Sequence, residues 1–275
     1  MRYTIEKNKI EIVGKGDFNP EHILECGQVF SFKKNEEGEY EVLSADKKAV
    51  ITETDEGFVI KTKDTAYFEE YFDLKTDYSS IKKRLGKYKI LEKPIEYGYG
   101  IRILKQNLFE TLISFIVSAN NNIKRIKMIL NRIREKYGKN MGGYHAFPTR
   151  EELLGATVQD FEELGAGYRA KYIFGVFRQV DEKTLESWRG LQTPQLRANL
   201  ISLMGVGPKV ADCVLLFGYG KKDVFPVDTW IAQMYNKYYD NLQNREKIRA
   251  NLLSEFGDFS GYAQQYLFFF MRANL

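Results

Sequence analysis

The sequence contains few of the residues that bind metals or form cross-links. Its 275 residues include only two cysteines, Cys26 and Cys213, and two histidines, His22 and His145. Two cysteines exclude a disulfide framework and a four-cysteine zinc or iron–sulfur site. Any chemistry must therefore come from lysine, aspartate, glutamate, tyrosine or a bound cofactor.

Long hydrophobic runs are also missing. The longest, such as YLFFFM near the C-terminus, are far shorter than the roughly 20 residues that a membrane-spanning helix needs. The charged opening MRYTIEKNKIEIVG lacks the apolar core of a secretory signal. We therefore expect a cytoplasmic protein with no membrane partner. Hydrophobic residues still make up 44% of the chain and aromatics 14%, which predicts a folded core rather than disorder.

Acidic residues are nearly absent from one stretch. Residues 120–140 hold seven lysines and arginines but a single acid, Glu135, although the net charge of the chain is only +4. Such a one-sided basic segment suits contacts with phosphates. It is equally typical of a solvated helix face, so by itself it does not identify a partner.

Two kinds of hydrophobic pattern divide the chain. From about residue 29 to 63 apolar residues alternate with polar ones, which predicts an antiparallel β-meander. The segments TAYFEEYF and YSSIKKRL read as helices, and beyond the glycine-rich YGYG the pattern stays helical. The fold class we expect is α+β. An antiparallel β-sheet domain with helices spans residues 1–95, and an all-α domain spans residues 96–275.

The helical part carries clear start signals. Thr149 with Glu152, and Thr157 with Asp160, have the spacing of capping boxes. Thr193, followed by a proline, reads as an N-cap. The nearly all-apolar segment from residue 108 to 119 predicts a buried central helix.

The stretch LMGVGPKVADC, residues 203–213, predicts two helices joined by a tight turn, a hairpin at about 194–218. Gly205 and Gly207, on either side of Val206, permit positive φ and a close approach of another backbone. Pro208 fits the first helical position, where a missing N–H costs nothing. The free N–H groups at this helix start could bind a phosphate. The same pattern could also serve packing alone.

This hairpin, together with the downstream Asp228, resembles the helix-hairpin-helix superfamily of DNA glycosylases. Within it, the chain resembles the 8-oxoguanine DNA glycosylase/lyase family, whose segments it matches in order from residue 26 to residue 270. The matching segments are CGQVFSF, SANNNIKRI, LGAGYRAKY, GVGPKVADC, FPVDTWIAQ and GYAQQYLFFF. The resemblance implies a TBP-like N-terminal sheet domain and no cofactor.

Two residues carry the chemistry that the resemblance implies. Lys209 lies just inside a helix start, where the helix dipole disfavours a second positive charge, as an amine nucleophile requires. In the family the matching lysine attacks the sugar C1′ and holds the sugar while the strand is nicked. Asp228 precedes a predicted helix, so it reads as an N-cap. It can at the same time stabilise a cationic sugar. Alone, Lys209 could instead be a surface lysine that binds a phosphate.

A base pocket is implied by a second set of residues. Cys213 follows Lys209 by four, and Gln264 and Phe268 repeat that spacing, so each pair shares a helix face. An enzyme that acts on a base must take it out of the duplex. The family stacks that base between the matching cysteine and phenylalanine, and its glutamine bonds the Watson–Crick edge. Phe217 is assigned to the same pocket. Taken alone, Cys213 and Phe268 would be core residues by default.

Lesion recognition and the gap left in the duplex are assigned to further residues. The carbonyl of Gly27 would accept from the N7 hydrogen that distinguishes 8-oxoguanine from guanine. Alternatively, Gly27 is a turn glycine before a strand. Four residues match those that fill the gap and contact the partner cytosine: Asn120, Arg125, Tyr168 and Arg169. Asn120 could otherwise end a helix, and Arg125 could contact a phosphate. Trp230 departs from the family pattern, which often has histidine there.

The leading hypothesis is a bifunctional enzyme that excises 8-oxoguanine from duplex DNA and cleaves the abasic strand by β-elimination. Its partner would be double-stranded DNA with 8-oxoguanine, preferably opposite cytosine, and it would act as a monomer, at the nucleoid in a bacterium. No metal site is predicted, apart from a monovalent ion that the hairpin backbone could hold. The alternatives are another glycosylase of the superfamily, for alkylated or oxidised bases, and a non-catalytic DNA-binding module.

Overall fold

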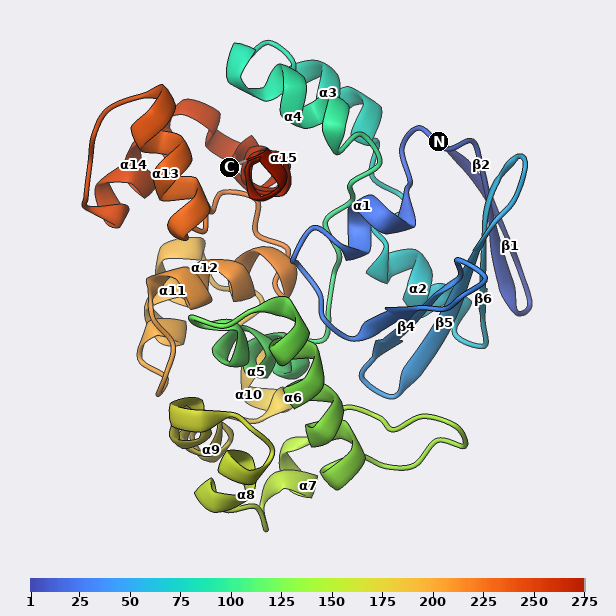
Figure 1. Cartoon of the computed structure of the whole chain (residues 1–275), viewed down its shortest axis with the longest axis vertical. Coiled ribbons are helices and arrows are strands. Elements are labelled where there is room, and N and C mark those ends of the chain that lie inside the picture. The colour runs from blue at the N-terminus through green and yellow to red at the C-terminus, as the bar shows by residue number, and fades with distance from the viewer. Residues whose placement is uncertain (275) are drawn as a thin grey trace.

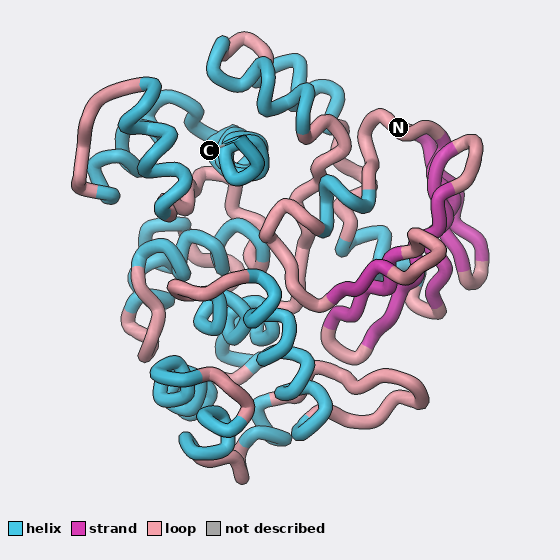
Figure 2. The backbone as a smooth tube through the Cα atoms, viewed as in Figure 1, coloured by secondary structure: helices cyan, strands magenta, loops and turns pink. Residues whose placement is uncertain are grey.

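The computed structural model describes residues 1–274 and contains one antiparallel sheet beside a large group of helices (Figure 1). The six strands lie in the order β1-β2-β6-β5-β4-β3. Figure 2 shows all of the strands gathered on one side of the molecule. Their bounds are β1 Arg2–Glu6, β2 Lys9–Val13, β3 Phe32–Lys34, β4 Tyr40–Ser44, β5 Lys47–Glu53 and β6 Gly57–Thr62.

One face of the sheet is buried, as alternation requires. Val42, Ile51 and Ile60 point into a core that two helices cover, α1 (Pro20–Leu24) and α2 (Thr65–Tyr71). The predicted meander is confirmed as β3 to β6. The β1–β2 hairpin extends the same sheet, because β2 pairs with β6 and buries Ile10 and Ile12. Its charged sequence did not predict it.

The rest of the described chain is helical, which confirms the predicted α+β class. The longer helices are α3 Tyr78–Leu85, α5 Leu108–Ser118, α6 Ile123–Tyr137, α9 Ala170–Gln179, α11 Thr193–Ile201, α12 Pro208–Phe217, α13 Thr229–Tyr238, α14 Arg245–Phe256 and α15 Ser260–Asn274. Shorter ones are α4 Glu92–Tyr97, α7 Arg150–Leu153, α8 Val158–Glu163 and α10 Glu182–Ser187. Helix α5 is buried along almost its whole length, as its apolar sequence predicts.

The molecule has two hydrophobic cores, and the residues of each core do not follow the division that the hydrophobic pattern of the sequence predicts. Tyr78, Leu85 and Ile95 belong to the helical core, with α4 packed against α15. Leu104 returns to the core under the sheet. The chain therefore crosses between the cores more than once. The boundary at residues 95 and 96 stays a prediction.

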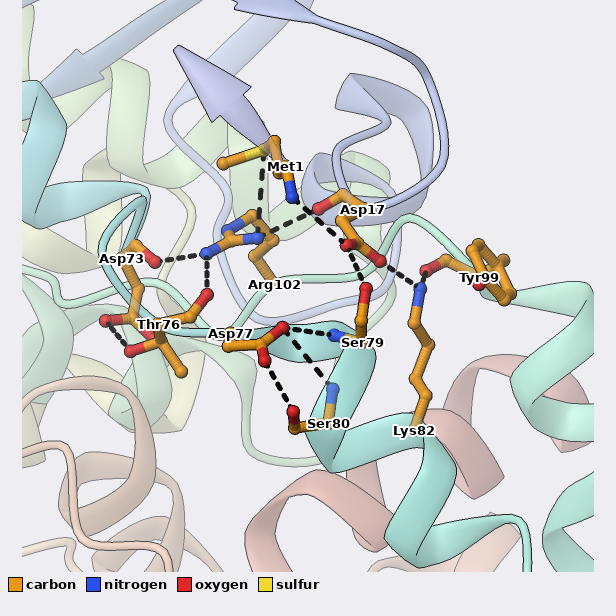
Figure 3. A network of polar contacts seen from close by, with 10 residues as sticks. All are labelled: Met1, Asp17, Asp73, Thr76, Asp77, Ser79, Ser80, Lys82, Tyr99 and Arg102. Carbon is orange, nitrogen blue, oxygen red and sulfur yellow. Dashed lines mark hydrogen bonds and ion pairs between the residues drawn. The ribbon is translucent and has the colours of Figure 1, made fainter.

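A polar network around Arg102 holds together the segments that pass between the two cores (Figure 3). The fully buried guanidinium donates to the carbonyls of Phe72, Asp17, Asp73 and Thr76. The carbonyl of Arg102 in turn accepts from Gln28 Nε2 at 2.7 Å. Because buried polar groups must be paired, this network fixes the path of the segment that follows Gly27.

The helix starts test local predictions. Both capping boxes form, Thr149 with Glu152 and Thr157 with Asp160. The prediction that Thr193 is an N-cap is wrong by one residue, since Gln192 holds that position. The hydroxyl of Thr193 donates to Asp223 at 2.8 Å instead, a contact across the fold that sequence spacing cannot reveal.

Candidate active site

The predicted hairpin forms from α11 and α12. Gly205 has φ +79°, and the N–H of Val206 donates to the carbonyl of Leu203 at 3.1 Å, which closes the turn. Gly207 is the N-cap, and Pro208 begins α12. A side chain at Gly207 would meet no other atom within 4 Å, so the backbone before α12 is open to an approaching molecule.

Lys209 lies at the start of α12 and reaches toward the protein interior. It is half-buried, and its Nζ lies over the ring of Phe115, 5.3 Å from the centroid. One turn further on, Cys213 is 3% exposed. Burial raises the pKa of the Cys213 thiol to about 11, although the nearby Lys209 opposes this shift. The thiol is therefore neutral at pH 7 and offers an uncharged, polarisable surface beside the amine.

Asp228 caps α13, as predicted: its Oδ1 accepts from the N–H of Ile231 at 2.9 Å. Burial raises the pKa of the carboxyl group, and the Ile231 N–H and the charge of Lys209 partly offset that rise. The cap fixes the carboxylate, and the carboxylate interacts electrostatically with the lysine. The cap is thus confirmed, and the stabilisation of a cationic sugar by Asp228 stays a prediction.

Lys209 and Asp228 open into one small cavity that gathers every predicted base-recognition residue. Its lining consists of Gly27, Phe115, Lys209, Cys213, Phe217, Pro226, Asp228, Gln264, Gln265 and Phe268. The free volume is about 30 Å³, room for no more than one or two water molecules. A purine can enter only if a side chain moves. Phe268 is the least buried of the lining phenylalanines and is the candidate to move.

Gly27 adopts φ +80° and lies directly under Phe268. A Cβ at position 27 would lie 2.9 Å from Cε1 of that ring. Helix α15 also holds the flanking backbone, because Gln265 donates to the carbonyl of Cys26 at 2.8 Å and Arg272 donates to that of Glu25. Glycine is therefore required here both by backbone conformation and by space.

Gln264 presents an unsatisfied polar atom to the cavity. Its Nε2 donates to the carbonyl of Pro226 at 3.4 Å, while its Oε1 is buried and accepts no hydrogen bond within the described residues. A buried carbonyl oxygen without a donor is unfavourable. A ligand that carries an N–H group would satisfy it.

None of the residues assigned to the duplex gap lines this cavity. Asn120 is exposed and adopts φ +48°, an uncommon conformation for a residue other than glycine. Tyr168 is 53% exposed and donates to the carbonyl of Ala119 at 3.2 Å. Arg169 is buried, and its guanidinium donates to the carbonyls of Ala119 and Asn120. Arg169 thus holds the Asn120 loop in shape, and its contact with a cytosine stays a prediction.

The basic segment is only partly available to a partner. Arg125 is exposed and donates to the carbonyl of Gly165 at 3.0 Å. Arg134 is buried in an ion pair with Glu110, and Lys136 pairs with Asp160. The basic side chains of α6 are therefore not all solvated. Arg134 also donates to the carbonyl of Ala45, and this contact joins α6 to the sheet domain.

Phe115, Pro226 and Gln265 line the cavity although the sequence analysis gave them no role. Pro226 and Gln265 lie within matched segments, and Phe115 lies outside all of them. Phe115 lies within an all-apolar helix, where every residue resembles core. Its ring stacks on that of Phe217, with the two ring centroids 5.4 Å apart. A larger groove of about 580 Å³ lies between β3, β4 and α6, but it contains neither Lys209 nor Asp228.

Among residues 1–274, no cluster of histidine, cysteine and carboxylate side chains could hold a metal ion. The ion at the hairpin stays a prediction. Over the same residues, no helix is long and apolar enough to cross a bilayer.

Comparison with known families identifies both parts of the chain. The model of the HhH-GPD superfamily of base excision DNA repair proteins matches residues 113–257. The model of the 8-oxoguanine DNA glycosylase N-terminal domain matches residues 11–112.

Individual relatives cover most or all of the chain. The 8-oxoguanine glycosylase/lyase of Clostridium acetobutylicum, solved with double-stranded DNA containing cytosine opposite 8-oxoguanine, is 38% identical. It has a TM-score of 0.91, over 100% of this chain and 98% of that one. A probable N-glycosylase/DNA lyase of Methanothermobacter thermautotrophicus is 33% identical over 73% of this chain and 72% of its own length. The N-glycosylase/DNA lyase of Saccharomyces cerevisiae is 36% identical over 62% of this chain, which spans 56% of that protein. The chain therefore belongs to the 8-oxoguanine DNA glycosylase family of the HhH-GPD superfamily.

Proposed function

We propose that this protein excises 8-oxoguanine from duplex DNA and then cleaves the abasic strand. The observation that carries the proposal is the cavity that Lys209, Asp228 and Gln264 share. It brings together an amine, a carboxylate and an amide oxygen that accepts no hydrogen bond from residues 1–274. A non-catalytic DNA-binding module would need none of these three together. A monofunctional glycosylase would not need the lysine.

The chemistry follows from the positions of the two charged groups. Lys209 Nζ attacks C1′ as the bond from C1′ to N9 of the base breaks, and the base leaves with the bonding electron pair and takes up a proton. The Asp228 carboxylate stabilises the positive charge that develops on the sugar. The bond between C1′ and the ring oxygen O4′ then breaks, O4′ takes up the remaining amine proton, and an imine forms between Lys209 and C1′. Removal of a C2′ proton then expels the 3′ phosphate by β-elimination.

Recognition of the lesion rests on Gly27 and on the stacking pair. The Gly27 carbonyl would accept the N7 hydrogen that guanine lacks, because Gly27 lines the cavity beside Phe268. Cys213 and Phe268 would enclose the flat base, and Gln264 Oε1 would accept from its Watson–Crick edge. Asn120, Tyr168 and Arg125 would fill and border the gap left in the duplex, opposite cytosine.

The test compares three duplexes of one sequence that contain 8-oxoguanine opposite cytosine, 8-oxoguanine opposite adenine, or a normal guanine–cytosine pair. We expect base release and strand nicking with the first duplex, and none with the third. Nicking of the normal duplex, or no release from the first, would overturn the proposal. We also propose that the enzyme acts as a monomer in the cytoplasm, at the nucleoid of a bacterial cell.

A further inference from the structure

Helix α12 buries a carboxylate close to the nucleophile. Residues 210–217 are apolar except for Asp212, which is 1% exposed. Asp212 follows Lys209 by three positions, so the two are neighbours on the helix surface, and it directly precedes Cys213. Besides burial, the charges of Asp212, Asp228 and Lys209 all act on the pKa of the Cys213 thiol. Asp212 is therefore a second carboxylate near the reactive amine.

Two arginines from neighbouring helices hold this carboxylate. Arg197 on α11 donates to both oxygens, at 2.8 Å from Nε and 3.3 Å from Nη2. Arg249 on α14 donates from its Nε at 2.9 Å. Each arginine side chain is only 15% exposed, so salt and water screen these pairs little. Asp212 does not line the base cavity. It thus ties α12 to α11 and α14 without entering the site.

The charges of this cluster balance. Glu246 on α14 accepts from Arg197 at 2.9 Å, so two carboxylates face two guanidinium groups. The Asp212 network, defined as Asp212, Arg197, Arg249 and Glu246, is therefore neutral as a whole. Taking charges out of water is costly, and well-packed apolar side chains often replace a buried ion pair with no loss of stability. Stability alone therefore does not account for a buried carboxylate at this place in α12.

We infer that the Asp212 network positions Lys209 and keeps its amine reactive, because Asp212 fixes α12 while the arginines balance the charge of Asp212. The inference rests on the proposed function. An unbalanced carboxylate beside an amine favours the ammonium form, which has no lone pair for attack on C1′. The arginines prevent this effect. Asp212 and its partners act through Lys209 and are positioning residues.

The other groups around the amine are few. Asp228 at the start of α13 and the thiol of Cys213 interact electrostatically with Lys209, and the ring of Phe115 on α5 is uncharged. Arg245 on α14 acts on Asp228 in turn. None of these groups changes when the Asp212 network is altered, so a change in the network can be measured against a constant background.

The test measures how fast the amine forms a covalent adduct at different pH values. The probe is a duplex with a preformed abasic site opposite cytosine, mixed with sodium cyanoborohydride. The Lys209 amine adds to the C1′ aldehyde, water leaves, and hydride from cyanoborohydride reduces the imine to a stable amine. The initial rate should fall towards low pH as the amine takes up a proton. The midpoint of that fall is the readout.

Charge variants should move the midpoint in opposite directions. Arg249→Met leaves the network negative and should raise the midpoint by at least about half a pH unit. Arg249 is chosen because Asp212 is its one ion-pair partner within residues 1–274. Asp212→Asn leaves the network positive and should lower the midpoint by about as much. The double variant is neutral again, so its midpoint should return to within about 0.2 pH units of the native value.

A structural role alone gives a different result. Loosening of α12 lowers the maximal rate in each variant, but it does not move the midpoint in two directions. Glu246→Gln removes a negative charge at a residue that is 51% exposed, where the fold is not at risk. It should lower the midpoint in the direction of Asp212→Asn, by a smaller amount because water screens it. Lys15→Met, in an exposed ion pair with Glu53 in the sheet domain, should leave the midpoint unchanged.

Native midpoints in Arg249→Met and Glu246→Gln, or shifts of the same sign in Arg249→Met and Asp212→Asn, would overturn the inference. A shift in Lys15→Met as large as that in Arg249→Met would overturn it as well. The proposed function fails separately, if the native protein forms the adduct at a preformed abasic site but releases no 8-oxoguanine. No adduct from the native protein would overturn both.

Discussion

The ring of Phe268 rests on Gly27, so closely that a Cβ at position 27 would lie 2.9 Å from the Cε1 atom of the ring. The two residues are far apart in the sequence and meet because α15 binds the backbone carbonyls of the two residues before Gly27. The glycine therefore sets where one wall of the base cavity lies. It also presents the carbonyl that we propose reads the lesion.

Gly27→Ala, compared with a matched control, should distinguish the effect of the contact with Phe268 from the effect of backbone strain. Gly38 is the matched control, because it has φ +85° and open space around it. Both alanine variants should lose about 1–2 kcal/mol in the free energy of unfolding, measured with urea, since both adopt a left-handed conformation. Only Gly27→Ala should slow 8-oxoguanine excision, by at least about tenfold. Equal excision rates in the two variants would show that Phe268 and Gly27 need not fit together.

Asp228→Asn should separate the cap from the charge. Asparagine caps a helix about as well as aspartate, so the free energy of unfolding should change by less than about 0.5 kcal/mol. Single-turnover excision should fall by about 10²–10³-fold, because the carboxylate that faces the developing sugar cation is lost. Asp181→Asn, at the N-cap of α10, is the control that should leave excision unchanged. An Asp228→Asn enzyme with native rates would make Asp228 a cap and nothing more.

The native enzyme should also lose activity on acidification earlier than an ordinary aspartate would allow. Burial raises the pKa of Asp228 in the folded protein, so the carboxylate is protonated as the pH falls through that raised value. The measurement is the single-turnover excision rate against pH, with circular dichroism to show that the fold persists. A rate that stays flat down to the ordinary pKa of aspartate would contradict an essential carboxylate.

Gln264→Leu should cost recognition without costing stability. Its Oε1 accepts no hydrogen bond within the described residues, so leucine removes an unfavourable buried acceptor. Leucine also removes the long 3.4 Å bond from Nε2 to the carbonyl of Pro226, which is weak and should cost little. The neighbouring Gln265→Leu is the contrast, because Gln265 satisfies the carbonyl of Cys26 and its loss should cost about 1–3 kcal/mol. Excision measured for Gln264→Leu should drop while its urea midpoint stays native or rises. A lowered midpoint would mean that Gln264 is structural.

The buried amine of Lys222, six residues before Asp228, should make the free energy of unfolding depend on pH. Its Nζ is buried with no hydrogen-bond partner among residues 1–274, and burial lowers its pKa to about 8. Between pH 8 and the ordinary value of 10.5 the unfolded chain binds more protons, so stability rises with pH across that window. Lys222→Met should therefore be more stable than the native protein by about 3 kcal/mol at pH 7. This advantage should shrink by about half by pH 9.5. A constant difference between the two pH values would show that the amine is already paired.

The sequence predicted what depends on local pattern and on the family's motifs. Alternation and spacing gave the meander, the buried α5, both capping boxes and the hairpin, and the motifs gave the residues that converge on the cavity. Contacts between distant segments could not be read in this way. Phe115 is an ordinary core residue until Lys209 lies over it, and Arg169 looks like an exposed cation until its guanidinium is seen to hold the Asn120 loop. The N-cap prediction for Thr193 was wrong for the same reason, because its hydroxyl donates to the distant Asp223.

The central claim is that Lys209 forms a covalent bond with the sugar, and borohydride trapping tests it most directly. The native protein, incubated with an 8-oxoguanine–cytosine duplex and sodium borohydride, should give a covalent protein–DNA adduct, because reduction of the imine fixes the bond. Lys209→Gln should bind the duplex and give no adduct. No adduct from the native protein, or an adduct of equal yield from Lys209→Gln, would contradict the account.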